Sequence, residues 1–225
     1  HINPAVTIAL AAWGRFSWKD VLPYVSAQLV GAFLAAAALF AVYAPFLSER
    51  ERELRVTRGQ TGSEVTAMCY GEYFPNPGLI ATTPLYVEGN HERLAELVPH
   101  GSAFAIEVLG TALLALVVFA TTDEGNLPRP ISQLAPVFIG LTVAILISVI
   151  APLTQACFNP ARDFGPRLFT SLAGWGQVAL PGPNGSGFFT VYILAPTLGA
   201  VLGGGLYTRV LHPALPADAE EKARY

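Results

Sequence analysis

Long apolar runs without charge alternate with short polar segments along this chain. Asp, Glu, Lys and Arg are absent between Asp20 and Glu49, between Arg129 and Arg162, and between Arg167 and Arg209. A helix needs about 20 consecutive apolar residues to cross the hydrocarbon core of a bilayer. The pattern therefore predicts four membrane-spanning helices, over Val21–Phe46, Ala103–Thr122, Gln133–Ile150 and Phe188–Tyr207.

Two shorter apolar stretches, Pro4–Trp13 and Pro160–Leu172, are too short to cross a bilayer. Each begins within an Asn-Pro-Ala triplet, Asn3-Pro4-Ala5 in the first case and Asn159-Pro160-Ala161 in the second. Asn is a favoured helix N-cap, and Pro is favoured at the first helical position, where its missing N–H costs nothing. We therefore expect two half-helices that enter the membrane without crossing it.

The repeat extends beyond the triplets, because each half-helix is followed by a span that carries a Gly-Ala pair, Gly31-Ala32 or Gly199-Ala200. Small residues allow helices to approach closely in a membrane. Duplicated broken helices are typical of transporters built from inverted repeats. Two spans precede the second triplet and none precedes the first, so symmetry predicts two further helices, about 55 residues, upstream of His1. We expect the chain to be a fragment on this ground.

The segments between the apolar runs set the predicted organisation. We expect the end of a first repeat over residues 1–46, an aqueous extracellular loop over 47–102, a second repeat over 103–211 and a cytoplasmic tail over 212–225. The orientation rests on basic residues of short loops, which mark the cytoplasmic side. If the spans alternate, one side holds Arg15, Lys19, Arg129, Arg209, Lys222 and Arg224.

The composition agrees with a membrane protein and disfavours other classes. Charged residues make up 13% of the chain and the mean hydropathy is +0.47, whereas soluble domains carry about 25% charged residues. The net charge of −3 comes without a basic patch for nucleic acid, and two cysteines support no disulfide framework. Neither a metal-ligand cluster nor a nucleophile–base pair nor a cofactor motif stands out. We therefore expect no enzyme activity, no cofactor and no metal.

The paired triplets, with Arg162 directly after the second, resemble the signatures of the aquaporin, or major intrinsic protein, family. The glycerol-facilitator branch is the closer match. It is supported by Asp163 after Arg162, by Thr122–Asn126, by Phe74-Pro75-Asn76-Pro77 and by Leu172–Gly176. The resemblance implies an all-α membrane protein, a right-handed helix bundle with inverted repeats. A complete subunit has six spans and two re-entrant half-helices, and four subunits with one pore each form a homotetramer.

The resemblance also implies a pore site around the two triplets. Two half-helices that enter from opposite faces bring their positive N-termini together at mid-membrane, and this potential repels cations and protons. Asn3 and Asn159 would donate N–H groups to a passing oxygen. Arg162 would be the selectivity-filter arginine, since its planar fork suits adjacent hydroxyls. The family's spacing places two more filter positions at Ala156 and Ile147.

Further residues are expected to support or flank this pore. By resemblance, Glu107 braces the backbone of the pore loop and His1 lies at the cytoplasmic mouth, with a structural role for His1 as the alternative. Asp163 is expected to brace the loop that holds Arg162. An ion pair between Arg162 and Asp163 is the structural alternative. Cys157, two residues before Asn159, is predicted to line the pore and to react with mercurials, with a buried position as the alternative.

The implied function is a passive channel in the plasma membrane for glycerol and similar small neutral solutes, with water as a co-permeant and with ions and protons excluded. Ile147 does not fit the histidine pattern of water-selective members. Ala156 leaves space that an aromatic ring fills in typical glycerol facilitators. Neutral metalloid acids are therefore also considered as permeants. The alternatives are a channel for water or metalloid acids, a non-conducting fragment or structural paralogue, and, from another class, a membrane enzyme.

Overall fold

The computed structural model describes residues 1–80, 96–123, 125–126 and 131–215, and all regular secondary structure within them is helical. Within the described residues, four helical stretches are long and apolar enough to span a membrane. They are α2 (Trp18–Leu54), α7 (His100–Thr121), α8 (Ala135–Thr154) and the composite stretch Gly187–Ala214. Each contains or closely matches one of the spans predicted from hydropathy, so the all-α membrane fold is confirmed.

The composite stretch joins several helical types end to end. It consists of α10 (Gly187–Phe189), η4 (Thr190–Leu194), α11 (Ala195–Leu206), η5 (Tyr207–Leu211) and η6 (His212–Ala214). Both η4 and η5 are π-helical turns.

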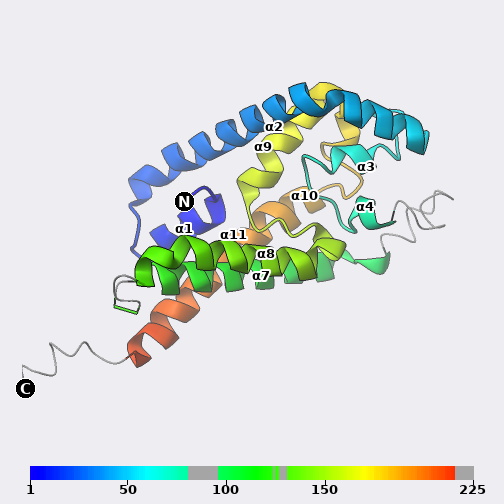
Figure 1. Cartoon of the computed structure of the whole chain (residues 1–225). Helices are drawn as coiled ribbons and strands as arrows, with labels where there is room; N and C mark the ends of the chain where they lie inside the picture. The colour runs from blue at the N-terminus through cyan, green and yellow to red at the C-terminus, as the bar shows by residue number, and fades with distance from the viewer. Residues whose placement is uncertain (81–95, 124, 127–130, 216–225) are drawn as a thin grey trace, which may run out of the picture.

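The half-helices are α1 (Pro4–Ala12) and α9 (Pro160–Thr170), and each begins at the proline of its triplet. A π-turn, η2 (Ser171–Trp175), and a short 3-10 turn, η3 (Gly176–Val178), continue α9. In Figure 1, α1 and the start of α9 lie between α2 on one side and the neighbouring helices α7 and α8 on the other, and α9 then runs up along α2. The N-terminal ends of the two half-helices therefore meet in the middle of the bundle.

The segment that follows the first predicted span differs from the expected aqueous loop. Helix α2 continues past Phe46 to Leu54, and the chain then turns back through α3 (Glu64–Ala67) to α4 (Pro77–Ile80). Ala67, Tyr70 and Tyr73 are buried in a cluster with Trp175 and with Ala36 of α2. The described first half of this loop is thus part of the core, because its aromatic side chains pack against the segment after α9.

Close helix contact occurs at glycines, although not at every predicted one. A Cβ at Gly199 or Gly203 of α11 would lie 2.3 Å from the carbonyl oxygen of Val108 or 2.0 Å from that of Ala112, both in α7. Gly31 of α2, in contrast, has nothing within 4 Å of such a Cβ. The tight contact of α2 is made instead by Gly165 of α9, whose added Cβ would lie 2.8 Å from the Leu29 carbonyl oxygen.

One end of the molecule is closed by polar contacts between three turns. Asp123, after α7, accepts a 2.6 Å hydrogen bond from Arg15, which follows α1. His212 of η6 lies 3.6 Å from the same carboxylate. One face of the molecule therefore holds the turn with Arg15, the turn with Asp123 and the C-terminal end of the composite stretch. A 3-10 turn, η1 (Ile131–Leu134), precedes α8. The predicted basic positions Arg129, Lys222 and Arg224 lie outside the described residues.

Candidate functional site

The N-termini of α1 and α9 meet through reciprocal hydrogen bonds of the two triplet asparagines. Asn3 Nδ2 donates to the Phe158 carbonyl at 2.7 Å, and Asn159 Nδ2 donates to the Ile2 carbonyl at 3.0 Å. Each Oδ1 caps its own helix by accepting the N–H of the alanine in its triplet, at 2.9 Å for Ala5 and 3.1 Å for Ala161. The capping expected from Asn-Pro chemistry is therefore present at both helices, and it joins the two halves of the molecule.

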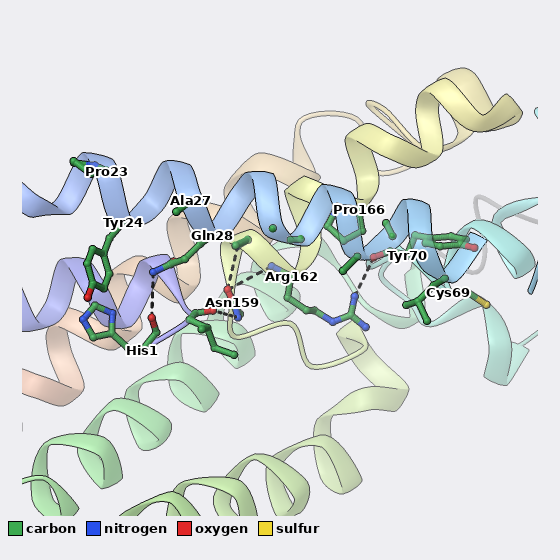
Figure 2. A pocket seen from close by; sticks show the side chains of 17 residues that line it. His1, Pro23, Tyr24, Ala27, Gln28, Cys69, Tyr70, Asn159, Arg162 and Pro166 are labelled. Carbon is green, nitrogen blue, oxygen red and sulfur yellow. Dashed lines mark hydrogen bonds between the residues drawn. The ribbon is translucent and has the colours of Figure 1, made fainter. Parts of the chain in front are cut away.

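A cavity of about 880 Å³ extends beside this junction, along one face of α2. Figure 2 shows His1 and Tyr24 toward one end of it and Tyr70 and Cys69 toward the other, with Asn159 and Arg162 between them. The α2 wall presents small side chains: Ala27, Gly31, Ala32, Ala35 and Ala36. This wall is therefore largely small and apolar, with Tyr24 and Gln28 as its polar members, and a short row of polar groups lies opposite it.

The loop that leads into α9 is held in an unusual backbone conformation by Glu107. Gln155, Ala156 and Phe158 all have positive φ, between 53° and 62°, a region that non-glycine residues seldom adopt. Glu107, buried in α7, accepts the N–H groups of Cys157 at 3.0 Å and Phe158 at 2.9 Å, together with the Thr154 hydroxyl at 2.6 Å. With the loop N–H groups tied to a carboxylate, the carbonyl of Phe158 points to the other half-helix, where Asn3 binds it.

Arg162, at the start of α9, is held by one end of its guanidinium. Its Nη1 donates to the Tyr70 carbonyl at 3.1 Å and forms an ion pair with Glu72. The Arg162 side chain is 44% exposed, whereas the Glu72 side chain is completely buried. The arginine therefore lines the cavity with the remainder of its fork, as Figure 2 shows.

Asp163 pairs with Arg167 and not with Arg162. Arg167 donates Nη2 to Asp163 Oδ1 at 2.7 Å and Nε to Oδ2 at 2.9 Å, and both side chains are buried. Asp163 also accepts the backbone N–H of Glu72 at 2.7 Å, while Arg167 donates to the carbonyls of Ala179 and Glu72. This pair fastens the 68–74 segment, which provides both partners of Arg162, to α9.

The remaining predicted site residues have different surroundings. Asn3 is 8% exposed and, unlike Asn159, is not among the residues that line the cavity. Ala156 is buried against Ile150 and Phe158, and Ile147 of α8 is 42% exposed. Neither of these two lines the cavity along α2. His1 does line it, and its Nδ1 lies 2.9 Å from the Thr7 hydroxyl.

The predicted pore-lining position of Cys157 is wrong. Its side chain is buried in a cluster with Phe74, Val191 and Tyr192, and its Sγ lies 3.3 Å from the Asn159 carbonyl oxygen. The loop turns the thiol away from the cavity, because the N–H of the same residue is bound to Glu107 on α7. Cys69 is the exposed thiol, and it lines the cavity.

Sequence reasoning missed two charged residues of the site, Glu72 and Arg167. Arg167 stands four residues after Asp163, a helical spacing that favours an ion pair. The Asp163–Arg167 pair could therefore have been predicted from the sequence. Glu72 offered a weaker signal: it is a lone acid within the aromatic run Tyr70–Phe74. Its partner Arg162 is 90 positions away in the sequence, and only the folded chain brings the two together.

Comparisons with known proteins agree on one family. The sequence profile of the major intrinsic protein family matches residues 1–207. The glycerol uptake facilitator protein of Pseudomonas aeruginosa is 42% identical over 232 residues, covering 100% of this chain and 75% of its own length. The glycerol uptake facilitator protein of Escherichia coli K12 is 37% identical, covering 99% of this chain and 73% of its own length.

Two further matches extend the comparison. A propanediol uptake facilitator of Salmonella typhimurium is 37% identical, with coverage of 97% of this chain and 75% of its own length. The aquaglyceroporin of Plasmodium falciparum has the same fold, with a TM-score of 0.72 at 24% identity, over 96% of this chain and 74% of that one. Because the family profile matches most of the chain and these relatives are similar over nearly all of it, the chain belongs to the major intrinsic protein family.

Proposed function

We propose that this protein is a passive membrane channel for glycerol and other small neutral solutes, and that water passes with them. The observation that carries the proposal is the joint presence of the Asn3–Asn159 junction and Arg162 beside one cavity, in a chain 37–42% identical to glycerol uptake facilitators. A binding protein for an anionic or large ligand would need a different lining, since small apolar side chains form most of the α2 wall.

The proposed route uses hydrogen-bond donors on one side and apolar surface on the other. An Asn amide has two N–H hydrogens, and each of Asn3 and Asn159 uses one on the carbonyl of the opposite repeat. By the family resemblance, the second hydrogen of each is left for a permeant oxygen, although of the two residues Asn159 alone lines the cavity along α2. Arg162 adds donors further along, and the carbon backbone of a polyol slides along Gly31 and Ala35 of α2. A solute with hydroxyls on one side and carbon on the other fits both walls.

Exclusion of protons and cations follows from the same arrangement. The positive ends of α1 and α9 face each other at the junction, and each carries a partial positive charge. A water molecule between the two amides accepts hydrogen bonds from both, which orients its own hydrogens outward. A chain of waters that could relay protons in one direction is therefore interrupted there.

The proposal includes four points that rest on the family resemblance. Ile147 and Ala156 are the two further filter positions given by the family's spacing, although neither lines the cavity along α2 and Ala156 is buried. The protein works as a homotetramer in the plasma membrane. Its cytoplasmic face carries the Arg15–Asp123–His212 contacts. Glu107 and Asp163 serve the pore indirectly, through the loops that they hold.

Stopped-flow light scattering of proteoliposomes tests the proposal. Vesicles that hold the protein should swell in isosmotic glycerol at least about tenfold faster than empty vesicles, and urea and 1,2-propanediol should also enter. Glycerol swelling equal to that of empty vesicles, with the protein shown to be inserted, would refute a solute channel. Fast water flux without glycerol entry would favour the water-channel alternative.

A further inference from the structure

Among the described residues, four charged side chains gather at the cavity wall, where Arg162 lines the cavity, and two of the others form a closed pair. Asp163 and Arg167 of α9 are joined by contacts of 2.7 and 2.9 Å, and neither is accessible to solvent beyond 2% of its side chain. Their charges compensate each other at close range. Arg162 and Glu72 remain as the second pair.

Glu72 has few means of compensation other than Arg162. Its side chain is completely buried, and within the described part of the chain neither carboxylate oxygen has a partner that satisfies hydrogen-bond geometry. A buried, unpaired carboxylate is strongly unfavourable, so the nearby guanidinium is what allows the acid to be held there. Arg162, in turn, is the member of the cluster that reaches the cavity.

We propose that Glu72 balances the charge of Arg162, so that the filter wall carries no net charge and the pore rejects anions as well as cations. This inference rests on the proposed function, with Arg162 on the permeation route. Glu72 does not touch the permeant, since its side chain is completely buried. It is a positioning and charge-balancing residue that acts through Arg162.

The need for such a residue follows from the rest of the site. The N-termini of α1 and α9 give the junction a positive potential, which repels cations but attracts anions. An uncompensated Arg162 would add a full positive charge to that attraction in a weakly polar cavity. With Glu72 ionised, the cluster holds two positive and two negative charges, Arg162 and Arg167 against Glu72 and Asp163. The donors of Arg162 remain for neutral solutes, while its long-range pull on anions is cancelled.

Nitrate and urea provide a matched pair of permeants, because both are small, planar and three-branched and only nitrate is charged. Proteoliposomes with Glu72→Gln are compared with wild type in isosmotic urea and in potassium nitrate, with valinomycin to carry the counter-ion. Glutamine preserves size and an acceptor oxygen but removes the charge. The nitrate-to-urea permeability ratio should rise about tenfold or more in the variant. Glu72→Asp, which preserves the charge, should remain near the wild-type ratio.

A titration of wild type provides a second measurement that needs no substitution. Burial raises the pKa of Glu72 well above its ordinary value of 4.5, against the lowering effect of Arg162. Acidification therefore protonates Glu72 and should raise the nitrate-to-urea ratio of wild type, while Glu72→Gln stays flat. The other groups that face Glu72 are retained in that variant: Arg162, Asp163, Arg167, Tyr73, Cys157 and Tyr192.

Two results would overturn the inference. One is a nitrate-to-urea ratio that is the same in Glu72→Gln and wild type and does not change with pH. The other is an equal rise in Glu72→Gln and Glu72→Asp, because a loss of packing and not of charge would then be the cause. If Glu72→Gln cannot be recovered in membranes, the wild-type titration decides. Absence of urea and glycerol flux in wild type would instead refute the proposed function itself.

Discussion

At the scale of single residues, Arg162 combines an anchored and a free half. Tyr70 and Glu72 hold Nη1, and the rest of the guanidinium faces the cavity. Arg162→Ala removes both the donors and the charge and leaves a wider opening. We expect the variant to pass water still, but to admit larger solutes and to leak protons at least about tenfold faster than wild type. Swelling assays and a pH-sensitive dye inside the vesicles measure both. If discrimination among glycerol, urea and protons stays at the wild-type level, Arg162 is not the filter.

The two cysteines differ in accessibility. Cys69 is exposed and lines the cavity, whereas Cys157 is buried with its Sγ against the Asn159 carbonyl. A charged methanethiosulfonate reagent should therefore modify Cys69 and slow glycerol flux several-fold, since the added group occupies the cavity. Cys69→Ser should abolish the effect and Cys157→Ser should preserve it. Inhibition that survives Cys69→Ser would place the reactive thiol elsewhere.

At the scale of helices, α11 packs closely against α7 because glycines of α11, which have no side chain, lie against the α7 backbone. An alanine at Gly203 would place its Cβ 2.0 Å from the Ala112 carbonyl oxygen, so the two helices would have to separate. We expect Gly203→Ala to lower the free energy of unfolding by about 1–3 kcal/mol, the usual cost of overpacking. Gly31→Ala is the matched control, because nothing lies within 4 Å of the added Cβ. Thermal unfolding in detergent compares the two, and equal transition temperatures would contradict the packing argument.

Helix positions could be predicted from the sequence wherever the cause is local. The starts of α1 and α9 follow from Asn-Pro capping, and the spans follow from charge-free length. The extension of α2 to Leu54 and the burial of Tyr70 and Tyr73 could not be predicted in this way, because the partner that buries them, Trp175, is remote in sequence. The orientation of Cys157 depends on positive φ angles at the residues on either side, Ala156 and Phe158, which neither residue type indicates. Local chemistry thus placed the half-helices, and long-range contacts decided what surrounds them.

At the scale of the whole molecule, Asp123 joins segments that are far apart in the chain. Its carboxylate accepts from Arg15, which also donates to the Phe119 carbonyl at 3.2 Å, and it lies 3.6 Å from His212. Arg15 in addition stacks over the Phe119 and Tyr207 rings. The end of the first half-helix is thereby fastened to α7 and to the C-terminal end of the last span. The junction at Asn3 and Asn159 fixes the other end of α1.

This second anchor makes a prediction about stability and pH. Partial burial raises the pKa of Asp123, but the hydrogen bonds from Arg15 and from the Gly125 N–H together lower it by more. The pKa of Asp123 therefore lies below its ordinary value of 3.8. The contribution of Asp123 is therefore complete above about pH 4 and is lost as the pH falls through the lowered pKa. Asp123→Asn should reduce stability at pH 7 by about 1 kcal/mol, as expected for a partly exposed pair, or about 2–4 °C in Tm. Its Tm should converge with that of wild type once the pH lies below the lowered pKa of Asp123. Glu53→Gln breaks a surface pair with Arg50 and is the control. Its Tm should equal that of wild type both at pH 7 and at low pH. A difference between Asp123→Asn and wild type that persists at low pH would show that packing, and not the carboxylate charge, holds this end of the molecule together.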